Sequence, residues 1–322
     1  MRIAVIGCGS IGLRHLRNLQ SLNFVDLVAY DTNAKTLEEI ESNIGVKSVG
    51  NIKDVWDMKP DVAVINTPTQ MHMEAALVAV TKGCHVFIEK PLSHTLEDVK
   101  CLTDALNETD LISMVGCNMR FHPGPSQVKK WLDGGSVGQP ISARIHTGSF
   151  LPRWRPEQDY HMNYSASAEW GGAILDCIHE IDLAIWLLGE AKLLSSVKVP
   201  ADSIHVQAEG LAEILLRHEG GAISSVHLNY VQRNYDRGIQ IIGSEGTIQW
   251  RFDGANGETL LFGQDGEIKE QLSQPAGWSM NSMYMEEMRY FTSCIEKGEP
   301  TFNPVEIAAG TLNLALEARS QA

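Results

Sequence analysis

Three glycines near the N-terminus, Gly7-x-Gly9-x-x-Gly12, constrain the fold more than any other feature of this 322-residue chain. They follow a run of mostly β-branched residues, Arg2–Ile6, and precede a helical pattern. In a strand–turn–helix the first glycine permits a tight turn, the second lets a pyrophosphate approach the backbone, and the third lets helix and strand pack closely. The sequence therefore predicts a dinucleotide site on the loop formed by Gly7, Gly9, Ser10, Ile11 and Gly12.

Short apolar runs alternate with helical patterns over the first third of the chain. The runs expected to form buried strands are Arg2–Ile6, Val25–Tyr30, Val62–Asn66, His85–Ile88 and Leu111–Gly116. The segments with helical periodicity are Ile11–Ser21, Ala34–Ser42, Met71–Thr81 and Leu96–Asn107. Because strands and helices alternate with short connections, we predict a doubly wound parallel sheet with helices on both faces.

The alternation stops near Arg120–Pro125, and a different pattern follows. Helical patterns lie at Ser126–Asp133, Gly172–Leu188, Tyr284–Cys294 and Pro304–Ala318. Strand-like runs separated by turn residues lie at Leu211–Arg217, Ala222–Tyr230, Ile239–Ile242 and Thr247–Arg251. The turns predict antiparallel hairpins of one open sheet. We therefore predict two α/β domains, residues 1–120 and residues 121–322.

The balance of charges narrows the class of partner. The chain has 26 Lys and Arg against 40 Asp and Glu, a formal net charge of −14. An acidic surface repels nucleic acid and anionic membranes, so we predict a small-molecule partner, with no nucleic acid and no membrane. Six cysteines without C-x-x-C spacing are typical of buried free thiols in a reducing compartment. Because no apolar run reaches the ~18 residues of a membrane span, we predict a cytoplasmic protein.

An acidic residue stands where a dinucleotide site needs one. Asp31 ends the second predicted strand about 20 residues after Gly12. Its carboxylate can accept hydrogen bonds from both ribose hydroxyls and would repel a 2′-phosphate. Thr32 follows it rather than an arginine, so the sequence favours NAD as the cofactor. Lys35, one turn into the next helix, leaves the use of NADP open.

A second candidate is the tripeptide Glu89-Lys90-Pro91, which directly follows the strand His85–Ile88. Ligands of open α/β sheets bind beyond the carboxyl ends of the strands, so we expect this tripeptide at the cofactor. A lysine there can stabilise a developing alkoxide or polarise a carbonyl group, and the proline can hold the turn through a cis peptide bond. A solvated Glu–Lys pair at the end of a strand is the alternative interpretation.

The third candidate is the segment Gly172–Asp182. On a continuous helix, Asp176, His179 and Asp182 recur at three-residue steps and share one face. A histidine beside carboxylates suits general-base work, because a carboxylate fixes its tautomer and stabilises the imidazolium. A half-buried structural histidine is the alternative. We predict no metal site, since a zinc motif H-E-x-x-H starting at His179 would need a second histidine where Leu183 stands.

Taken together, these motifs resemble the glucose–fructose oxidoreductase/inositol dehydrogenase/MocA (Gfo/Idh/MocA) family. The resemblance covers essentially the whole chain, and its further motifs are Thr67-Pro68-x-x-x-His72, Asn118-x-Arg120-Phe121-x-Pro123 and Gly243-x-x-Gly246-Thr247. It implies a Rossmann domain, followed by an α/β domain whose large, mostly antiparallel sheet supports a homodimer or homotetramer. It also implies hydride exchange between a nicotinamide cofactor and, usually, a sugar or polyol.

The resemblance also implies roles for single residues. Lys90 matches the active-site lysine, and Asp176 and His179 match the acid and the histidine opposite it. Many relatives place four residues between these two steps, whereas Asp176 and His179 are three apart, which leaves the role of Asp176 open. Beside the glycine loop, the expected cofactor residues are Asp31, Thr67, Pro68, His72, Glu89, Lys90 and Asn118. The expected substrate residues, where the two domains meet, are Lys90, Arg120, Trp154, Tyr160, Asp176 and His179.

The resulting hypothesis is an oxidoreductase that uses NAD on a secondary alcohol or ketone of a sugar, amino sugar or nucleotide sugar. His179 accepts the hydroxyl proton, Lys90 stabilises the alkoxide, and Asp176 orients or polarises the pair. One alternative is NAD-dependent cleavage of a glycoside on the same fold. The other is a non-catalytic, cofactor-binding sensor, which has no need of Lys90 and His179.

Overall fold

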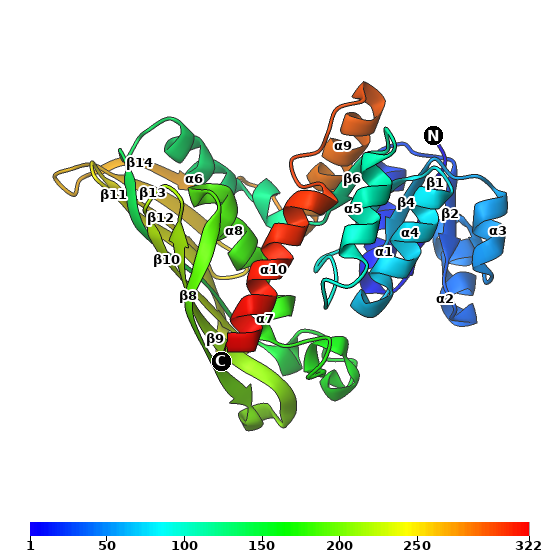
Figure 1. Cartoon of the computed structure of the whole chain (residues 1–322), viewed down its shortest axis with the longest axis horizontal. Coiled ribbons are helices and arrows are strands. Elements are labelled where there is room, and N and C mark those ends of the chain that lie inside the picture. The colour runs from blue at the N-terminus through cyan, green and yellow to red at the C-terminus, as the bar shows by residue number, and fades with distance from the viewer. Residues whose placement is uncertain (322) are drawn as a thin grey trace. The chain divides into compact units, whose positions relative to one another are not determined.

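The computed structural model describes residues 1–321 as two compact units (Figure 1). Unit 1 consists of Met1–Asn118 and Met280–Leu312, and unit 2 consists of Met119–Ser279 and the residues from Asn313 onward. The predicted division placed every residue after 120 in the second domain, whereas the structure groups Met280–Leu312 with the N-terminal segment.

Unit 1 is built on a six-stranded sheet with the order β3-β2-β1-β4-β5-β6, in which all neighbouring strands are parallel. The strands are β1 (Ile3–Ile6), β2 (Leu27–Tyr30), β3 (Lys47–Val49), β4 (Val62–Ile65), β5 (His85–Ile88) and β6 (Ser113–Val115). The predicted parallel sheet is confirmed, and the five predicted runs each contain one of its strands. Strand β3 was not predicted, because it is a three-residue edge strand without a buried side chain.

Helices connect these strands. They are α1 (Ser10–Ser21), α2 (Ala34–Glu39), the π-turn η1 (Ile40–Ile44), α3 (Ile52–Asp57), the 3-10 turn η2 (Thr69–Met71), α4 (His72–Thr81) and α5 (Val99–Asn107). After the second sheet the chain returns to this unit with α9 (Met280–Lys297) and the first part of α10 (Val305–Gln321). The chain steps one way through α1, from β1 to β2, and the other way through α4 and α5, from β4 to β6. Right-handed crossovers therefore place α1 on one face of the sheet and α4 and α5 on the other.

The predicted helix starting at Leu96 begins only at Val99. Asp98, the residue before it, has a φ of 61°, in the left-handed region that ends or precedes helices rather than continuing them. The predicted helix Ala34–Ser42 is an α-helix only as far as Glu39 and continues as a π-turn.

Two contacts explain why Met280–Leu312 belongs to unit 1. Phe291 of α9 packs against Phe87 of β5, with 5.6 Å between the ring centroids. Asn303 exchanges two hydrogen bonds with Val115 of β6: its carbonyl oxygen accepts the Val115 N–H and its side-chain amide donates to the Val115 carbonyl, both at 2.9 Å. A segment close to the C-terminus thus completes the β6 edge of the first sheet.

Unit 2 is built on an eight-stranded sheet with the order β14-β13-β12-β11-β7-β10-β9-β8. The strands are β7 (Pro140–Phe150), β8 (Ala191–Ala201), β9 (Val206–His218), β10 (Ile223–Asn229), β11 (Val231–Gly243), β12 (Thr247–Phe252), β13 (Gly257–Phe262) and β14 (Ile268–Ser273). All neighbouring pairs are antiparallel except β7 and β10, which are parallel. The predicted large, mostly antiparallel open sheet is confirmed, although β7, β8, β13 and β14 were not predicted as strands.

Helices cover one face of this sheet. They are α6 (Pro123–Asp133), α7 (Ala173–Asp176) and α8 (His179–Leu188), with 3-10 turns η3 (Asn118–Phe121), η4 (Leu151–Arg153), η5 (Tyr160–Met162), η6 (Tyr164–Ala166) and η7 (Asp202–Ile204). Helix α8 packs on β7 and β10, and α6 packs on β12 and β13 (Figure 1). The core beneath them is formed by buried side chains such as Ile145, Val226, Ile239 and Trp250.

The predicted continuous helix over Gly172–Leu188 is wrong. Helix α7 ends at Asp176 and α8 begins at His179, because Cys177 leaves helical geometry with a φ of −94° and a ψ of 31°. The apolar spacing continues through the break, so periodicity alone could not reveal it. Asp176 and His179 therefore lie on two successive helices, and the one-face spacing expected for them does not apply.

Two further expectations concern the burial of the cysteines and the possibility of a membrane-spanning helix. All six cysteines are free thiols, and five are buried; Cys101 is exposed, contrary to the prediction. Within residues 1–321, none of the helices combines the length and the apolar character needed to cross a membrane.

Candidate active site

The glycine loop lies between β1 and α1. Gly7 has a φ of +85°, and a Cβ there would lie 2.8 Å from the backbone of Asn66. At Gly12 a Cβ would lie 2.0 Å from the carbonyl oxygen of Gly7, so only a glycine lets the helix pack this closely. A Cβ at Gly9, in contrast, would meet no atom of the described chain within 4 Å. The open side of the loop is therefore at Gly9, the N-cap of α1, where the backbone can approach a pyrophosphate.

Asp31 follows β2 and faces the same loop. One of its carboxylate oxygens accepts the N–H of Cys8 at 2.7 Å, and the other accepts the N–H of Asn33 at 2.8 Å. These bonds fix the carboxylate beside the glycine loop and leave lone pairs for further donors such as ribose hydroxyls.

Two buried polar atoms follow β4. In the described part of the chain, neither Oδ1 of Asn66 nor Oγ1 of Thr67 has a hydrogen-bond partner. Such atoms are rare in folded proteins and call for an explanation, such as a ligand that supplies the missing bond. The glycine loop, the Asp31 carboxylate and these two atoms together fit a dinucleotide. Asn66 was not predicted as a site residue; its signal is its position directly after a buried strand of a parallel sheet.

His72 begins α4 and is buried, away from solvent. Its Nε2 lies 2.8 Å from the carbonyl oxygen of Thr67, and its Nδ1 lies 3.0 Å from that of Pro91. Burial is the largest influence on the imidazole and lowers the pKa of His72. The ring thus connects the chain after β4 to the chain after β5. Its direct contact with a cofactor stays a prediction.

Lys90 lies in the turn after β5, and the Lys90–Pro91 peptide is cis, which confirms the cis bond expected at this proline. Glu89 is 8% exposed, so the alternative of a solvated Glu–Lys pair is wrong. One Glu89 oxygen, Oε1, lies 2.7 Å from Nε2 of His15 in α1, and the other, Oε2, accepts the N–H of Lys90 at 3.1 Å.

The remaining predicted cofactor residues lie at element ends. Ser10 and Ile11 open α1, Pro68 precedes η2, and Asn118 is buried at the start of η3. Their contacts with a cofactor stay predictions.

In unit 2, the short helix α7 carries Asp176. The Oδ1 atom of Asp176 accepts the hydroxyl of Tyr164 at 2.7 Å. At the other end of the helix, Oε1 of Glu209 accepts the N–H of Ile174 at 3.3 Å. Gly172, with a φ of +94°, is the residue that lets Glu209 come this close, because a Cβ there would lie 2.1 Å from the same oxygen. Asp176 is therefore held on a helix that is fixed at both ends.

His179 is the first residue of α8, and two buried ion pairs hold the turn that it starts. Glu180 accepts a hydrogen bond from Nε of Arg237 in β11 at 2.5 Å. Asp182 accepts two hydrogen bonds from Arg120, at 2.9 and 2.6 Å. Arg120 was predicted to contact the substrate; its guanidinium is buried against Asp182. These partners lie far from α8 in the sequence, so no local pattern indicated them.

The two aromatic substrate candidates also have protein partners. Trp154 donates its Nε1–H to Oγ of Ser149 at 3.0 Å and is 40% exposed. Tyr160 donates its hydroxyl to the carbonyl oxygen of Ile204 at 3.1 Å. Their contact with a substrate stays a prediction.

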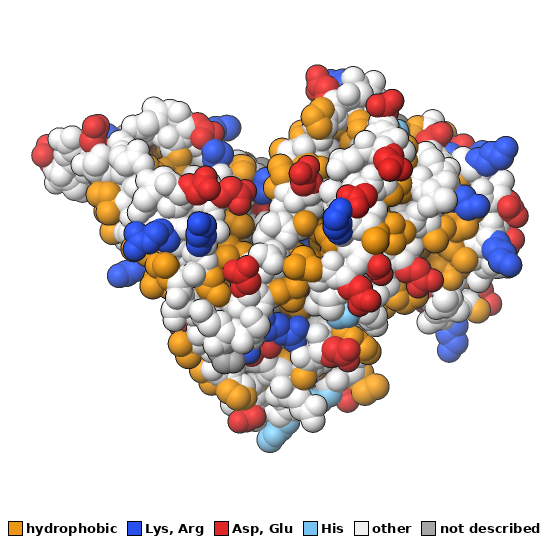
Figure 2. Space-filling model, in the orientation of Figure 1, with side chains coloured by type: hydrophobic (Ala, Val, Ile, Leu, Met, Phe, Trp, Pro, Cys, Tyr) orange, Lys and Arg blue, Asp and Glu red, His pale blue; other side chains and the backbone are white. Residues whose placement is uncertain are grey.

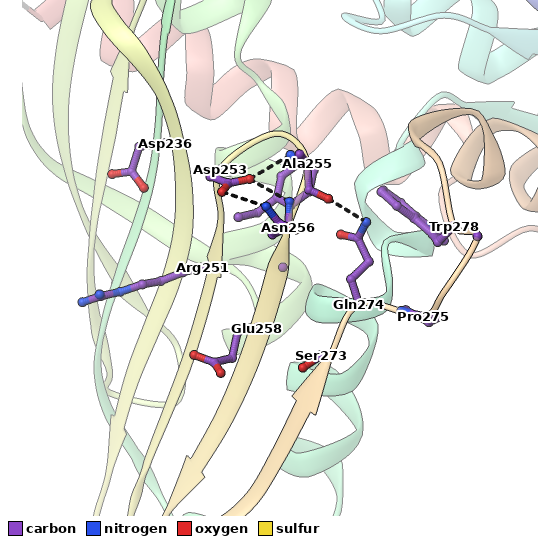
Figure 3. A pocket seen from close by; sticks show the side chains of 13 residues that line it. Asp236, Arg251, Asp253, Ala255, Asn256, Glu258, Ser273, Gln274, Pro275 and Trp278 are labelled. Carbon is purple, nitrogen blue, oxygen red and sulfur yellow. Dashed lines mark hydrogen bonds between the residues drawn. The ribbon is translucent and has the colours of Figure 1, made fainter.

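A pocket of about 690 Å³ in unit 2 contains none of the candidate residues (Figure 3). It lies around the turn between β12 and β13. Figure 3 shows Asp253 turned toward its own loop, where it accepts the N–H groups of Ala255 and Asn256 at 2.9 and 2.7 Å. Glu258 accepts a hydrogen bond from Gln271 at 2.7 Å. These acids are bonded within the protein, so the pocket gives no sign of a ligand. Over residues 1–321, no three His, Cys, Asp or Glu side chains form a group that could hold a metal ion.

Two family models match the chain. Residues 1–117 match the model described as "Oxidoreductase family, NAD-binding Rossmann fold". Residues 126–249 match the model described as "GFO/IDH/MocA C-terminal domain".

Several characterised proteins are similar over most of the chain. A myo-inositol 2-dehydrogenase of Thermotoga maritima is 29% identical over 313 residues, which cover 93% of this chain and 90% of that protein. A levoglucosan dehydrogenase of Pseudarthrobacter phenanthrenivorans is 26% identical over 304 residues, which cover 82% and 77%.

Solved structures share the fold. The structure of levoglucosan dehydrogenase in complex with NADH and levoglucosan has a TM-score of 0.87 at 20% identity and covers 99% of this chain and 97% of that chain. An oxidoreductase from Agrobacterium radiobacter in complex with NAD+, L-tartaric acid and magnesium has a TM-score of 0.87 at 22% identity, covering 100% and 96%.

Proposed function

Because the chain belongs to the GFO/IDH/MocA oxidoreductase family, with an NAD-binding Rossmann domain over residues 1–117, we propose that it transfers hydride between NAD and a secondary alcohol or ketone of a sugar, sugar derivative or polyol. The family predicted from the motifs is confirmed by both matches. The observation that carries the proposal is the cradle formed by Gly7, Gly9, Gly12 and Asp31, which fits the cofactor. The names of the relatives, inositol and levoglucosan dehydrogenases, support the substrate class.

The roles of the residues follow from their chemistry. When bound, NAD supplies or accepts the hydride. The Lys90 ammonium stabilises the alkoxide that forms as the substrate hydroxyl loses its proton. His179 accepts that proton, since an imidazole near neutral pH is suited to general-base work. Asp176, fixed by Tyr164, binds or orients a substrate hydroxyl.

We propose NAD rather than NADP as the preferred cofactor. The Asp31 carboxylate is held beside the glycine loop by the N–H groups of Cys8 and Asn33, so it cannot readily turn away from a 2′-phosphate. The charge repulsion between the two anions disfavours NADP.

The test uses two alanine variants and a panel of sugars and polyols. Lys90→Ala and His179→Ala should lose turnover, measured as NADH absorbance, while NADH binding, measured by fluorescence titration, survives. Asp202→Ala, which replaces an exposed residue of η7, is purified and assayed in the same way as a control. Near-normal rates in both active-site variants would refute the assignment.

Neither alternative function is favoured by a specific observation. Release of free sugar from a glycoside without net NADH formation would identify the glycoside-cleaving reaction. NADH binding without turnover across the whole panel would identify the sensor.

We also propose that the protein forms a homo-oligomer through the outer face of the eight-stranded sheet. That sheet exposes large apolar side chains, including Ile141, Val197, Val199, Leu215 and Ile242. Hydrophobic side chains also appear along the edge of the sheet in Figure 2. We expect these apolar side chains to be covered where two copies pack through this face, since exposed apolar patches mark protein–protein contacts. Light scattering measures the assembly, and a monomer would refute the proposal. The predicted cytoplasmic location stays a prediction.

A further inference from the structure

The turn that carries Lys90 has a buried acid directly before the lysine. Glu89 is 8% exposed, and both of its oxygens are engaged, one with His15 and the other with the N–H of Lys90. A buried carboxylate is costly unless its charge is compensated. The negative charge of Glu89 therefore needs compensating partners at the candidate active site.

His15 shows that the acid has a dedicated partner. It is fully buried, and its ring meets the edges of Phe87 and Tyr284 at centroid distances of 5.3 and 6.1 Å. Its Nε2 lies 2.7 Å from Glu89, whereas its Nδ1 has no hydrogen-bond partner among the described residues. The imidazole is thus placed in an apolar cage for the one contact with Glu89.

The electrostatics of Glu89 favour its charged form. Burial by itself raises the pKa of Glu89, but the hydrogen bond and charge of His15 and the charge of Lys90 outweigh burial and lower it below the usual value. Because the interaction between two charges is mutual, an anion that is stabilised by Lys90 also stabilises the Lys90 ammonium.

Other charged and titratable groups face the same turn. Helix α1 contributes His15 and Arg14, the latter stacked on Tyr284 with 4.4 Å between its guanidinium carbon and the ring centroid. Helix α4 contributes His72, and α9 contributes Tyr284 and Glu287. Burial, together with the charge of Glu89, raises the pKa of Tyr284, so the tyrosine is neutral near pH 7. Glu89 is therefore the anion that is both covalently next to Lys90 and bonded to its backbone.

We propose that Glu89 and His15 are positioning residues for Lys90: Glu89 is the fixed counter-charge that keeps the Lys90 side chain an ammonium ion, and His15 anchors Glu89 to α1. Helix α1 also bears the glycine loop at its N-terminus, only a few residues before His15. The pair therefore ties the cofactor-binding helix to the lysine turn. The inference rests on the proposed role of Lys90, and it adds the group that sets the charge of this lysine.

The first test measures the charge of Lys90 without using turnover. Trace acetylation of the full-length protein with acetic anhydride, read by mass spectrometry of the Lys90 peptide, gives the pH midpoint at which the amine becomes reactive. We expect this midpoint to fall by about one pH unit in Glu89→Gln, because a neighbouring opposite charge moves a pKa by ~1–3 units. An unchanged midpoint would overturn the role of Glu89.

Controls separate this effect from general damage. Val55→Ala removes methyl groups from the buried cluster of Ala4, Val28 and Val55 and should leave the Lys90 midpoint unchanged. If Glu89→Gln does not fold, the wild-type protein still decides: Lys90 must have a midpoint no lower than that of the exposed Lys35. A clearly lower midpoint would overturn the proposal.

The second test concerns His15 and includes rescue. His15→Phe fills the aromatic cage but removes the donor, and we expect kcat/KM to fall by about tenfold, the equivalent of one charge-assisted hydrogen bond. His15→Gln, whose amide can still donate to Glu89, should recover most of that loss. Equal rates in all three proteins would overturn the role of His15. If the wild-type protein shows neither NADH binding nor turnover, the proposed function fails instead, whereas the acetylation result stands independently.

Discussion

Two glycines of the same loop should respond to the same substitution in opposite ways. A Cβ at Gly12 would lie 2.0 Å from the carbonyl oxygen of Gly7, whereas ordinary contacts begin near 3.4 Å, so backbone must move by more than 1 Å. A Cβ at Gly9 would meet no described atom within 4 Å, and the φ of −65° at Gly9 is one that alanine adopts. Gly12→Ala should therefore damage the fold, and Gly9→Ala should damage only cofactor binding.

The magnitudes follow from these distances. Forcing extra volume into a packed site costs about 1–3 kcal/mol. At about 2–4 °C per kcal/mol for a unit of this size, Gly12→Ala should lower the melting temperature by about 3–10 °C. Gly9→Ala should change the free energy of unfolding by less than about 0.5 kcal/mol. A methyl group at the pyrophosphate contact should weaken NADH binding at least about tenfold, since ~1.4 kcal/mol corresponds to a factor of ten.

Thermal unfolding without cofactor and fluorescence titration with NADH measure the two effects separately. The wild-type protein and both variants are compared in the same buffer. If Gly9→Ala bound NADH as tightly as the wild type, the approach of the pyrophosphate to Gly9 would be refuted. If it lowered the melting temperature as much as Gly12→Ala, the open space at Gly9 would be refuted.

Three further outcomes are expected. Arg237→Met leaves Glu180 buried without its partner and should cost about 3–5 kcal/mol in urea denaturation, while the double variant Arg237→Met/Glu180→Gln should recover much of it; additive losses would contradict this. Burial lowers the pKa of His122 to about 3, below its unfolded value of ~6.5, so its contribution to stability is complete above about pH 6.5 and is lost as the pH falls toward 3. His122→Asn keeps a side chain that can accept a hydrogen bond at the helix N-cap, and it should make the free energy of unfolding depend less on pH over this range. The same pH dependence in variant and wild type would argue against this role of His122. Asp31→Ser should lower the ratio of the NADPH dissociation constant to the NADH dissociation constant by at least about tenfold, as measured by binding titrations. An unchanged ratio would show that Asp31 does not select the cofactor.

The sequence predicted those parts of the fold that depend on local patterns. The glycine loop was predictable because each glycine answers a local steric demand. Five strands of the parallel sheet were predictable because each is a short, mostly apolar run. Strand β3 and strand β14 were not, since β3 has no buried side chain and every residue of β14 is exposed.

The candidate site was predictable in its residue types but not in its connections. Lys90 and His179 were found from motifs, but the contacts that hold their turns were not. His15 and Glu89 are 74 positions apart, and Arg120 and Asp182 are 62 apart. Contacts over such distances depend on the tertiary fold and leave no periodic signal. The same reason explains why Arg120, which looked available for a substrate, is engaged by Asp182.

The break between α7 and α8 separates two anchoring systems. Asp176 is fixed through Tyr164 and Glu209, whereas the turn of His179 is fixed through Arg120 and Arg237. A continuous helix would have transmitted any shift of Asp176 to His179. Because α7 and α8 are separate helices, we expect a substitution in the loop that carries Tyr164 to shift Asp176 more than His179. Under the roles proposed for Asp176 and His179, changes around Tyr164 would alter substrate recognition more than proton transfer, so the two properties could evolve separately.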